Sequence, residues 1–246
     1  MKTVITFRKY ILILTFLPLV LWGRECPYAN GDCRKLLLDY LERMEGVGGP
    51  LEGKVYHLRY RMETEFTPNT GMDVQINNTE VLTSKERIMV HDQKMSVFGD
   101  RENIFVVLPQ QKRIYWNRSD PRIFKEMDAH AQLLEVQRSL LNSAKAMECS
   151  LADEDQIIIT VEPNLEFAKR ANLVLQKITY DTKEHRVLKV ENLYDGKSKI
   201  KRQVITYYVL DFDSAKKINP PIAELFKGNS LKPLYRDFEI IDNRKN

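Results

Sequence analysis

Three cysteines and four histidines are the residues of this 246-residue chain best suited to covalent or metal chemistry. Neither a G-x-S-x-G nucleophile motif nor a glycine-rich phosphate loop occurs. The histidines are scattered and none stands in a metal-binding spacing such as H-E-x-x-H, so we expect structural or surface roles for His57, His91, His130 and His185. The sequence therefore predicts no catalytic residue, no metal site and no cofactor.

Cys26, Cys33 and Cys149 are an odd number, so at most one intramolecular disulfide forms. Two pairings stay open. A Cys26–Cys33 bond closes a small loop ahead of the first predicted helix, whereas a Cys33–Cys149 bond ties that helix to the end of a long central helical segment. Because Cys26 follows an apolar run, acylation of this cysteine is a further alternative, although two charged residues before it fit a lipobox poorly.

The N-terminus has the pattern of an export signal. Three basic residues precede an apolar run from Tyr10 to Trp22, which stops at Gly23. A secretory signal has about 7–15 apolar residues, whereas a membrane-spanning helix needs about 20. We therefore expect a signal peptide over residues 1–23, a single domain over 24–246, and a periplasmic or secreted protein. An uncleaved anchor is the alternative, because the residues before Gly23 lack the small-x-small cleavage pattern.

The charge balance argues against a nucleic-acid partner. The chain has 38 basic and 34 acidic residues, and removing the three basic residues of the leader leaves 35 against 34. A nearly neutral domain offers no electrostatic reason to bind nucleic acid. Its 43% hydrophobic and 29% charged content is typical of a folded soluble domain. We expect a monomer.

The hydrophobic pattern changes from helical to extended near the start of the domain. Apolar residues recur every three or four positions from Asp32, a good N-cap, to Gly46, a good helix stop. From Gly53 to Phe66 the period is two, with apolar residues alternating with charged ones. This predicts a short amphipathic helix followed by an antiparallel strand with one solvated face.

Further strands and a second helical region complete the predicted fold. The segment from Pro121 to Met147 has helical spacing. Strand-like runs lie on both sides of it, at Asp73 to Thr79, Val81 to His91, Lys94 to Phe98, Asn103 to Leu108, Arg113 to Trp116, Gln156 to Val161, Asn172 to Tyr180, Arg186 to Leu193, Lys199 to Phe212 and Phe238 to Ile241. This order predicts an α+β fold, a strongly curved antiparallel sheet (an unclosed half-barrel) covered by helices.

Several stretches resemble one family, the bacterial periplasmic lipoprotein carriers (LolA-like) with their outer-membrane relatives. They are the helix leading into Lys54 to Phe66, the strand Lys112 to Trp116, and two late hairpins at Tyr180-Asp181 and Asp195-Gly196. Where the carriers commonly have an Asp-Gly turn, this chain has Gly99 to Asn103, which marks it as a distant member. The resemblance implies a half-barrel with helices across its mouth.

The resemblance also implies a function: binding of a lipid or an acylated protein inside the half-barrel, for carriage or sensing with a partner at the cell envelope. It further implies that Arg59 or Arg61 locks the helical lid. Apolar residues of the alternating strands and of the helical segment are the candidate lining, namely Tyr56, Leu58, Tyr60, Met62, Ile88, Val90, Phe105, Val107, Ile114, Trp116, Phe124, Met127 and Leu134.

Two other functions stay open at this point. In the first, the chain is a structural or regulatory envelope protein whose half-barrel is filled by its own side chains. In the second, it is an exported hydrolase whose site is assembled from residues far apart in the sequence. An open apolar cavity favours the carrier, a filled one the structural protein, and a polar cleft with paired histidine and carboxylate the hydrolase.

Overall fold

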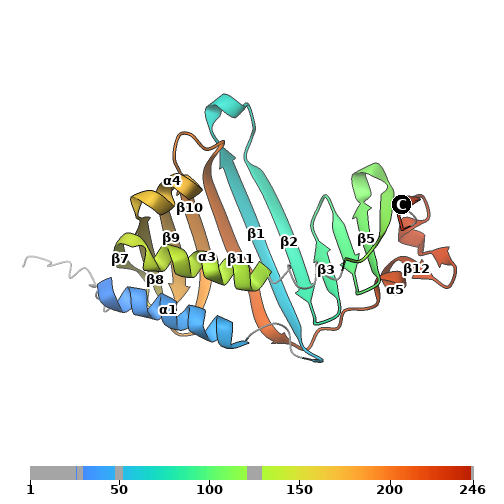
Figure 1. Ribbon diagram of the computed structural model, residues 1–246, viewed down its shortest axis with the longest axis horizontal. Coiled ribbons are helices and arrows are strands. Elements are labelled where there is room, and N and C mark those ends of the chain that lie inside the picture. The colour runs from blue at the N-terminus through green and yellow to red at the C-terminus, as the bar shows by residue number, and fades with distance from the viewer. Residues whose placement is uncertain (1–25, 27–29, 48–51, 121–128, 245–246) are drawn as a thin grey trace, which may run out of the picture.

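The computed structural model describes residue 26 and residues 30–47, 52–120 and 129–244, and one large sheet dominates it (Figure 1). The helices are α1 (Asn30–Val47), α3 (Ala129–Asn142), α4 (Leu165–Ala171) and α5 (Pro221–Leu225), with 3-10 turns η1 (Pro68–Thr70), η2 (Pro109–Gln111) and η3 (Pro233–Tyr235). The strands are β1 (Val55–Phe66), β2 (Gln75–Thr83), β3 (Ile88–His91), β4 (Ser96–Gly99), β5 (Asn103–Leu108), β6 (Arg113–Arg118), β7 (Ala144–Asp153), β8 (Gln156–Pro163), β9 (Leu173–Asp181), β10 (Arg186–Tyr194), β11 (Ile200–Ser214), β12 (Phe226–Lys227), β13 (Ser230–Leu231) and β14 (Glu239–Asp242).

Twelve of these strands form a curved, unclosed sheet in the order β14-β6-β5-β4-β3-β2-β1-β11-β10-β9-β8-β7. Neighbouring strands are antiparallel except β14 and β6, which run parallel. The sheet has two open edges, β7 and β14. This is the α+β half-barrel architecture that the sequence predicts.

Helices α1 and α3 lie side by side across β7 to β11 (Figure 1). The apolar stripe of α1, which includes Leu37 and Leu41, packs on alternating strand residues such as Ile159, Ile178 and Tyr180. Side chains at helical spacing form one apolar face of α1, and alternate residues of the strands form one apolar face of the sheet. These two faces pack together and form the main core. We call this side of the sheet the helix-side face.

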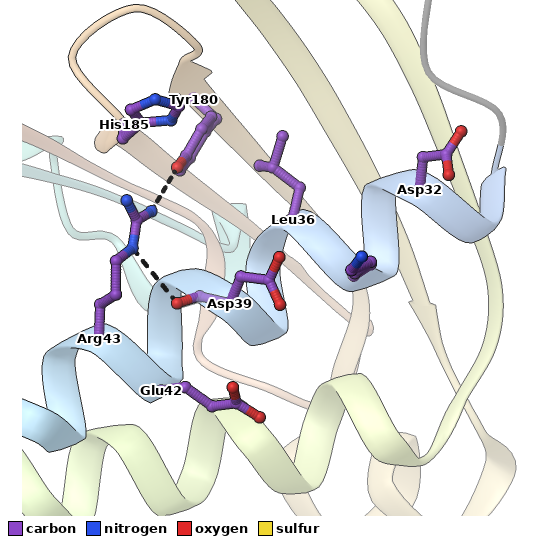
Figure 2. A pocket seen from close by; sticks show the side chains of 8 residues that line it. Asp32, Leu36, Asp39, Glu42, Arg43, Tyr180 and His185 are labelled. Carbon is purple, nitrogen blue, oxygen red and sulfur yellow. Dashed lines mark hydrogen bonds between the residues drawn. The ribbon is translucent and has the colours of Figure 1, made fainter.

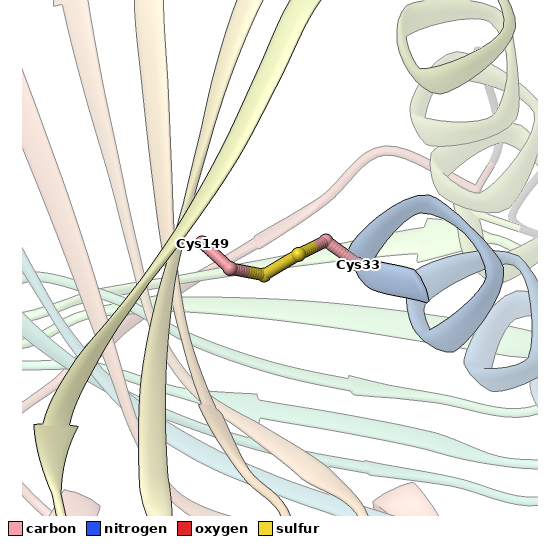
Figure 3. Close-up of a disulfide and its surroundings, with 2 residues drawn as sticks. All are labelled: Cys33 and Cys149. Atoms are coloured by element: carbon pink, nitrogen blue, oxygen red, sulfur yellow. A yellow bond between two sulfur atoms is a disulfide. The ribbon is translucent and has the colours of Figure 1, made fainter. Parts of the chain in front are cut away.

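A disulfide fixes α1 to the sheet. Cys33 on α1 bonds to Cys149 on β7, with Cα atoms 6.2 Å apart and 116 residues between them in sequence (Figure 3). Cys26 is not disulfide-bonded. Of the two pairings that the sequence left open, the structure therefore contains the longer loop, and its far end is a strand rather than the end of a helix.

The C-terminal segment, residues 215–244, covers the opposite side of the sheet over β3 to β6. Leu225, which is fully buried, packs there with Phe98, Phe105 and Ile114, and the aromatic ring of Phe226 lies 6.2 Å from that of Phe105. We call this side the outer face. The two coverings thus lie on opposite faces of opposite halves of the sheet.

Most elements lie where the sequence predicts them, but α5 and the β12–β13 hairpin were not predicted, and three further differences concern the main sheet and its helices. Residues 144–153 form strand β7, so the prediction of helix up to Met147 was wrong at its end. Helix α4 (Leu165–Ala171), capped by the Asn164 side chain, was not predicted. The expected strand from Val81 to His91 is divided between the end of β2 and β3.

The predicted leader, residues 1–23, lies outside the described residues. Within the described ranges, we find no helix with both the length and the apolar character needed to cross a bilayer.

Candidate functional site

Strand pairing shows one apolar row across the middle of the helix-side face, while the next row on this face, Gln176, Asn192, Gln203 and Thr64, is polar. Ile159 of β8 pairs with Ile178 of β9, which pairs with Val190 of β10. The row continues through Ile205 of β11 to Met62 of β1. Because directly paired residues share a face, these five side chains form one line that begins in the core under α1 and reaches β1.

A parallel row continues beyond β1 toward the other half of the sheet. Leu58 pairs with Val81, Val81 with Val90, Val90 with Val97, and Val97 with Val106. All five are half-buried, whereas Ile159 and Ile178 are buried. This one row thus stays apolar from β1 to β5, although its neighbours on β2, Thr79 and Thr83, are polar. Over β3 to β5 the described part of the chain packs its clusters on the outer face instead.

Two tyrosines mark the boundary between the covered and the half-buried parts of this face. Tyr60 of β1 pairs with Tyr207 of β11, and their ring centroids are 6.2 Å apart. Burial raises the pKa of Tyr207 to about 12, and the neighbouring Tyr60 hydroxyl adds to the shift. The surroundings of this pair therefore disfavour charge.

Six residues of the predicted lining share the helix-side face, namely Tyr56, Leu58, Tyr60, Met62, Ile88 and Val90. Tyr56 and Ile88 are buried, and the Tyr56 ring packs edge-on against Phe212 at 5.1 Å. The other four are half-buried. Phe124 and Met127 lie outside the described residues, and Leu134 is placed in α3 without a described side chain.

The pairing puts Phe105, Val107, Ile114 and Trp116 on the outer face, not with Tyr60. Each alternates along its strand with a residue of the helix-side face, as Phe105 does with Val106. Three of the four are at most 1% exposed, and they pack against the C-terminal segment. The sequence pattern grouped these four residues with the lining, because alternation along a strand reveals its two faces but not which segment of the chain covers each face.

The two predicted lid-locking arginines also lie on the outer face. Arg59 and Arg61 alternate with Leu58 and Tyr60 along β1, so their side chains leave the sheet away from α1 and α3. Arg61 Nη2 instead forms an ion pair with Glu63 Oε1 at 2.9 Å. This placement brings neither arginine to the helices.

Two other arginines, both on α1, hold the helices in place. Arg34 Nη2 donates to the carbonyl oxygen of Leu141 at the end of α3, at 2.7 Å. Arg43 Nη2 donates to the Tyr180 hydroxyl on β9, at 3.0 Å. No sequence pattern indicates these contacts, because arginines on the polar side of a helix usually face water.

A cavity of about 810 Å³ opens between α1 and the β9–β10 hairpin. Figure 2 shows the Arg43 side chain reaching from α1 toward Tyr180, with His185 beside it. The lining is mostly charged, with three acidic and two basic side chains besides His185, namely Asp32, Asp39, Glu42, Lys35 and Arg43. This cavity is polar and separate from the apolar row on the helix-side face.

The structure brings titratable groups together on the outer face. His57 Nε2 lies 2.8 Å from Glu80 Oε1, and Lys216 Nζ donates to the same oxygen at 2.6 Å. His91 Nδ1 lies 2.7 Å from Ser96 Oγ on the neighbouring strand. Neither group lines the cavities described here, and among the described residues no three His, Cys, Asp or Glu side chains are grouped to hold a metal ion.

No protein-family model and no curated protein matches the sequence. Among solved structures, an uncharacterized conserved protein from Thermus thermophilus matches over 84% of this chain and 99% of its own, at 7% identity and a TM-score of 0.40. A putative outer membrane lipoprotein-sorting protein domain from Vibrio parahaemolyticus matches over 73% and 93%, at 10% identity and a TM-score of 0.28. A LolA superfamily protein from Nitrosomonas europaea matches over 71% and 92%, at 10% identity and a TM-score of 0.26. At these identities and TM-scores, the similarities carry no argument about the role of this chain.

Proposed function

We propose that this protein binds an apolar or acylated ligand, such as the acyl chain of a lipoprotein, on the helix-side face of its sheet. The observation that carries the proposal is the row from Leu58 to Val106, whose five apolar side chains are all half-buried, whereas Ile159 and Ile178 under α1 are buried. A soluble protein seldom keeps a continuous apolar strip half-buried unless something binds there.

The binding energy comes from the removal of hydrocarbon from water. Each buried CH₂ group of an acyl chain contributes about 0.8 kcal/mol. An extended chain lying across β1 to β5 contacts the side chains of Leu58, Tyr60, Met62 and Val90. The Tyr60–Tyr207 pair stands at the edge of the covered core, so it is the natural position for one end of the chain.

The wider biological role follows the resemblance. We propose a non-enzymatic, exported, monomeric protein, with one domain over residues 24–246, that carries or senses its ligand at the cell envelope and hands it to a partner there. The leader pattern and the Cys33–Cys149 disulfide both support an oxidising compartment such as the periplasm or the exterior.

A binding titration with a fluorescent fatty acid tests the location of the site. We expect the Tyr60→Asp protein to bind at least about tenfold more weakly, because the acyl chain of the ligand would then have to pack against a charged carboxylate. The matched control is Tyr208→Asp, the same change at a 49% exposed tyrosine next to the bulge of β11. That variant keeps wild-type affinity.

Thermal unfolding of both variants separates loss of binding from loss of fold. Equal affinities of a folded Tyr60→Asp protein and the wild type contradict the proposed site. If the wild type binds neither the fatty acid nor an acylated peptide, a half-barrel filled by its own side chains is the better account.

A further inference from the structure

A second cavity lies at the rim of the sheet, just past the end of β1, whereas His57 is near the start of that strand. It has a volume of about 360 Å³ and lies between the β1–β2 connection and the β10–β11 hairpin. The two walls are joined by a hydrogen bond from Thr67 N to Lys199 O at 2.9 Å. The lining is Thr67, Asn69, Thr70, Met72, Gly196, Lys197, Ser198 and Lys199.

The polar groups of this cavity suit a phosphate group. Its lining contains two lysines and no carboxylate. Lys197 and Lys199 both lie on an exposed hairpin. Within the described part of the chain, neither of them forms an ion pair through its ammonium group. Ser198 Oγ accepts from Ile200 N at 3.0 Å and keeps its own proton to donate. The nearby Asp195 does not line the cavity, and its Oδ1 accepts from Lys197 N and Ser198 N at 3.0 and 3.2 Å.

Exposed apolar side chains begin at the cavity with Met72 and continue along the chain toward β2. Met72, which lines the cavity, is 46% exposed, and Val74 and Ile76 after it are 56% and 44% exposed. The β1–β2 connection that carries Met72 and Val74 projects beyond the neighbouring strand ends (Figure 1). One exposed carboxylate, Asp73, stands between Met72 and Val74, and the lysines lie on the neighbouring hairpin. Exposed hydrophobic residues at a projecting tip with lysines nearby are typical of surfaces that enter the interface of a membrane.

The basic character extends along the rim to α4. Asp195 N donates to Asn172 O at 2.8 Å, so the hairpin touches the end of α4. The last turn of α4 carries Lys169 and Arg170, and Leu165 on the same helix is 70% exposed. The end of α4 next to the hairpin therefore adds two basic side chains, while Leu165 and the acidic Glu166 lie at its other end.

We propose that this rim docks on an anionic lipid bilayer, with the cavity between η1 and the β10–β11 hairpin taking the phosphate of a lipid headgroup while Met72 and Val74 enter the interface. The two lysines suit the phosphate of a lipid, and the adjoining Met72 and Val74 suit its hydrocarbon. An acidic protein surface would pair with the lysines but would leave the exposure of Met72 and Val74 without a reason. This docking does not depend on acyl binding at the helix-side face.

Sedimentation with lipid vesicles tests the proposal, using the full chain as purified from an exporting host. We expect it to bind phosphatidylcholine vesicles that contain phosphatidylglycerol and to leave those of phosphatidylcholine alone. Lys197→Gln with Lys199→Gln weakens binding about tenfold or more, since each lysine near an anionic surface contributes independently. Met72→Ser with Val74→Ser also weakens it.

The matched control is Lys85→Gln with Lys183→Gln, which removes the same charge from exposed lysines in turns at the opposite ends of the strands. All variants share one N-terminus, so the leader contributes equally to each. Equal binding to both kinds of vesicle, no binding to either, or unchanged binding by the Lys197 and Lys199 variant overturns the proposal. Inorganic phosphate that saturates the site while vesicles do not sediment the protein also overturns it, in favour of a soluble phosphate ligand.

Discussion

At the scale of single residues, the Glu80 carboxylate lies at the centre of a small charged cluster on the outer face. It accepts hydrogen bonds from Lys216, where the C-terminal segment leaves β11, and lies beside His57, which is only 7% exposed. The hydrogen bond from Lys216 is the main cause of a lowered pKa of Glu80, and His57 adds to it. Glu80 thus joins β1, β2 and the C-terminal segment.

This contact predicts a pH-dependent loss of stability. A carboxyl group whose pKa is lower in the folded than in the unfolded chain stabilises the fold above the unfolded value, and the effect is lost as the pH falls through the folded value. We expect Glu80→Gln to lower the free energy of unfolding by about 1 kcal/mol at neutral pH. The difference from wild type should begin to shrink near the unfolded value of about 4.3 and disappear once the pH has fallen through the lower, folded value.

Urea unfolding at several pH values measures this difference. Glu86→Gln is the control, because Glu86 is 63% exposed and lies 3.9 Å from Arg101, so its removal changes little. A Glu80→Gln deficit that stays the same from neutral to acidic pH contradicts the role given to the carboxylate.

At the scale of elements, the attachment of α1 depends on its disulfide. A bond that closes a loop of this length restricts the unfolded chain strongly, so Cys33→Ala with Cys149→Ala should lower the free energy of unfolding by about 2–5 kcal/mol. Cys26→Ser is the control and should stay within about 0.5 kcal/mol of wild type. Urea unfolding of the three proteins without reductant gives the comparison. A double variant as stable as the control shows that packing alone holds α1.

The C-terminal segment gives a second prediction at this scale. Leu225 is fully buried against the outer face, so Leu225→Ala should lower the free energy of unfolding by about 2–5 kcal/mol. Leu234→Ala, at a 76% exposed leucine of the same segment, should change it by less than about 0.5 kcal/mol. Fatty-acid affinity should be unchanged in the folded Leu225→Ala protein. A large loss of affinity there places the ligand on the outer face instead.

The sequence predicts the elements better than their arrangement. Alternation from Val55 to Phe66 is regular enough to predict β1, because one face is charged. Residues 144–153 were mistaken for helix at their start, since Ala144, Lys145 and Ala146 have high helix propensity and only pairing with β8 overrides it. The faces of Phe105 and Ile114 depend on where residues 215–244 lie, which is a non-local property. Arg34 and Arg43 were missed for the same reason.

At the scale of the whole molecule, the sheet is covered twice, on opposite faces of its two halves. Helices α1 and α3 cover the helix-side face over β7 to β11, and the C-terminal segment covers the outer face over β3 to β6. The half-buried apolar row from Leu58 to Val106 lies where these coverings change sides. The proposed ligand site therefore arises from the arrangement of the coverings as much as from the strands themselves.

Native mass spectrometry of the full chain, purified without detergent from an exporting host, tests this account most directly. The account predicts a stoichiometric lipid or acyl adduct on the wild type and on Tyr208→Asp, and its loss from Tyr60→Asp. An adduct-free wild type that also takes up no added acylated peptide contradicts it, and an adduct retained by the folded Tyr60→Asp protein moves the site away from the helix-side face.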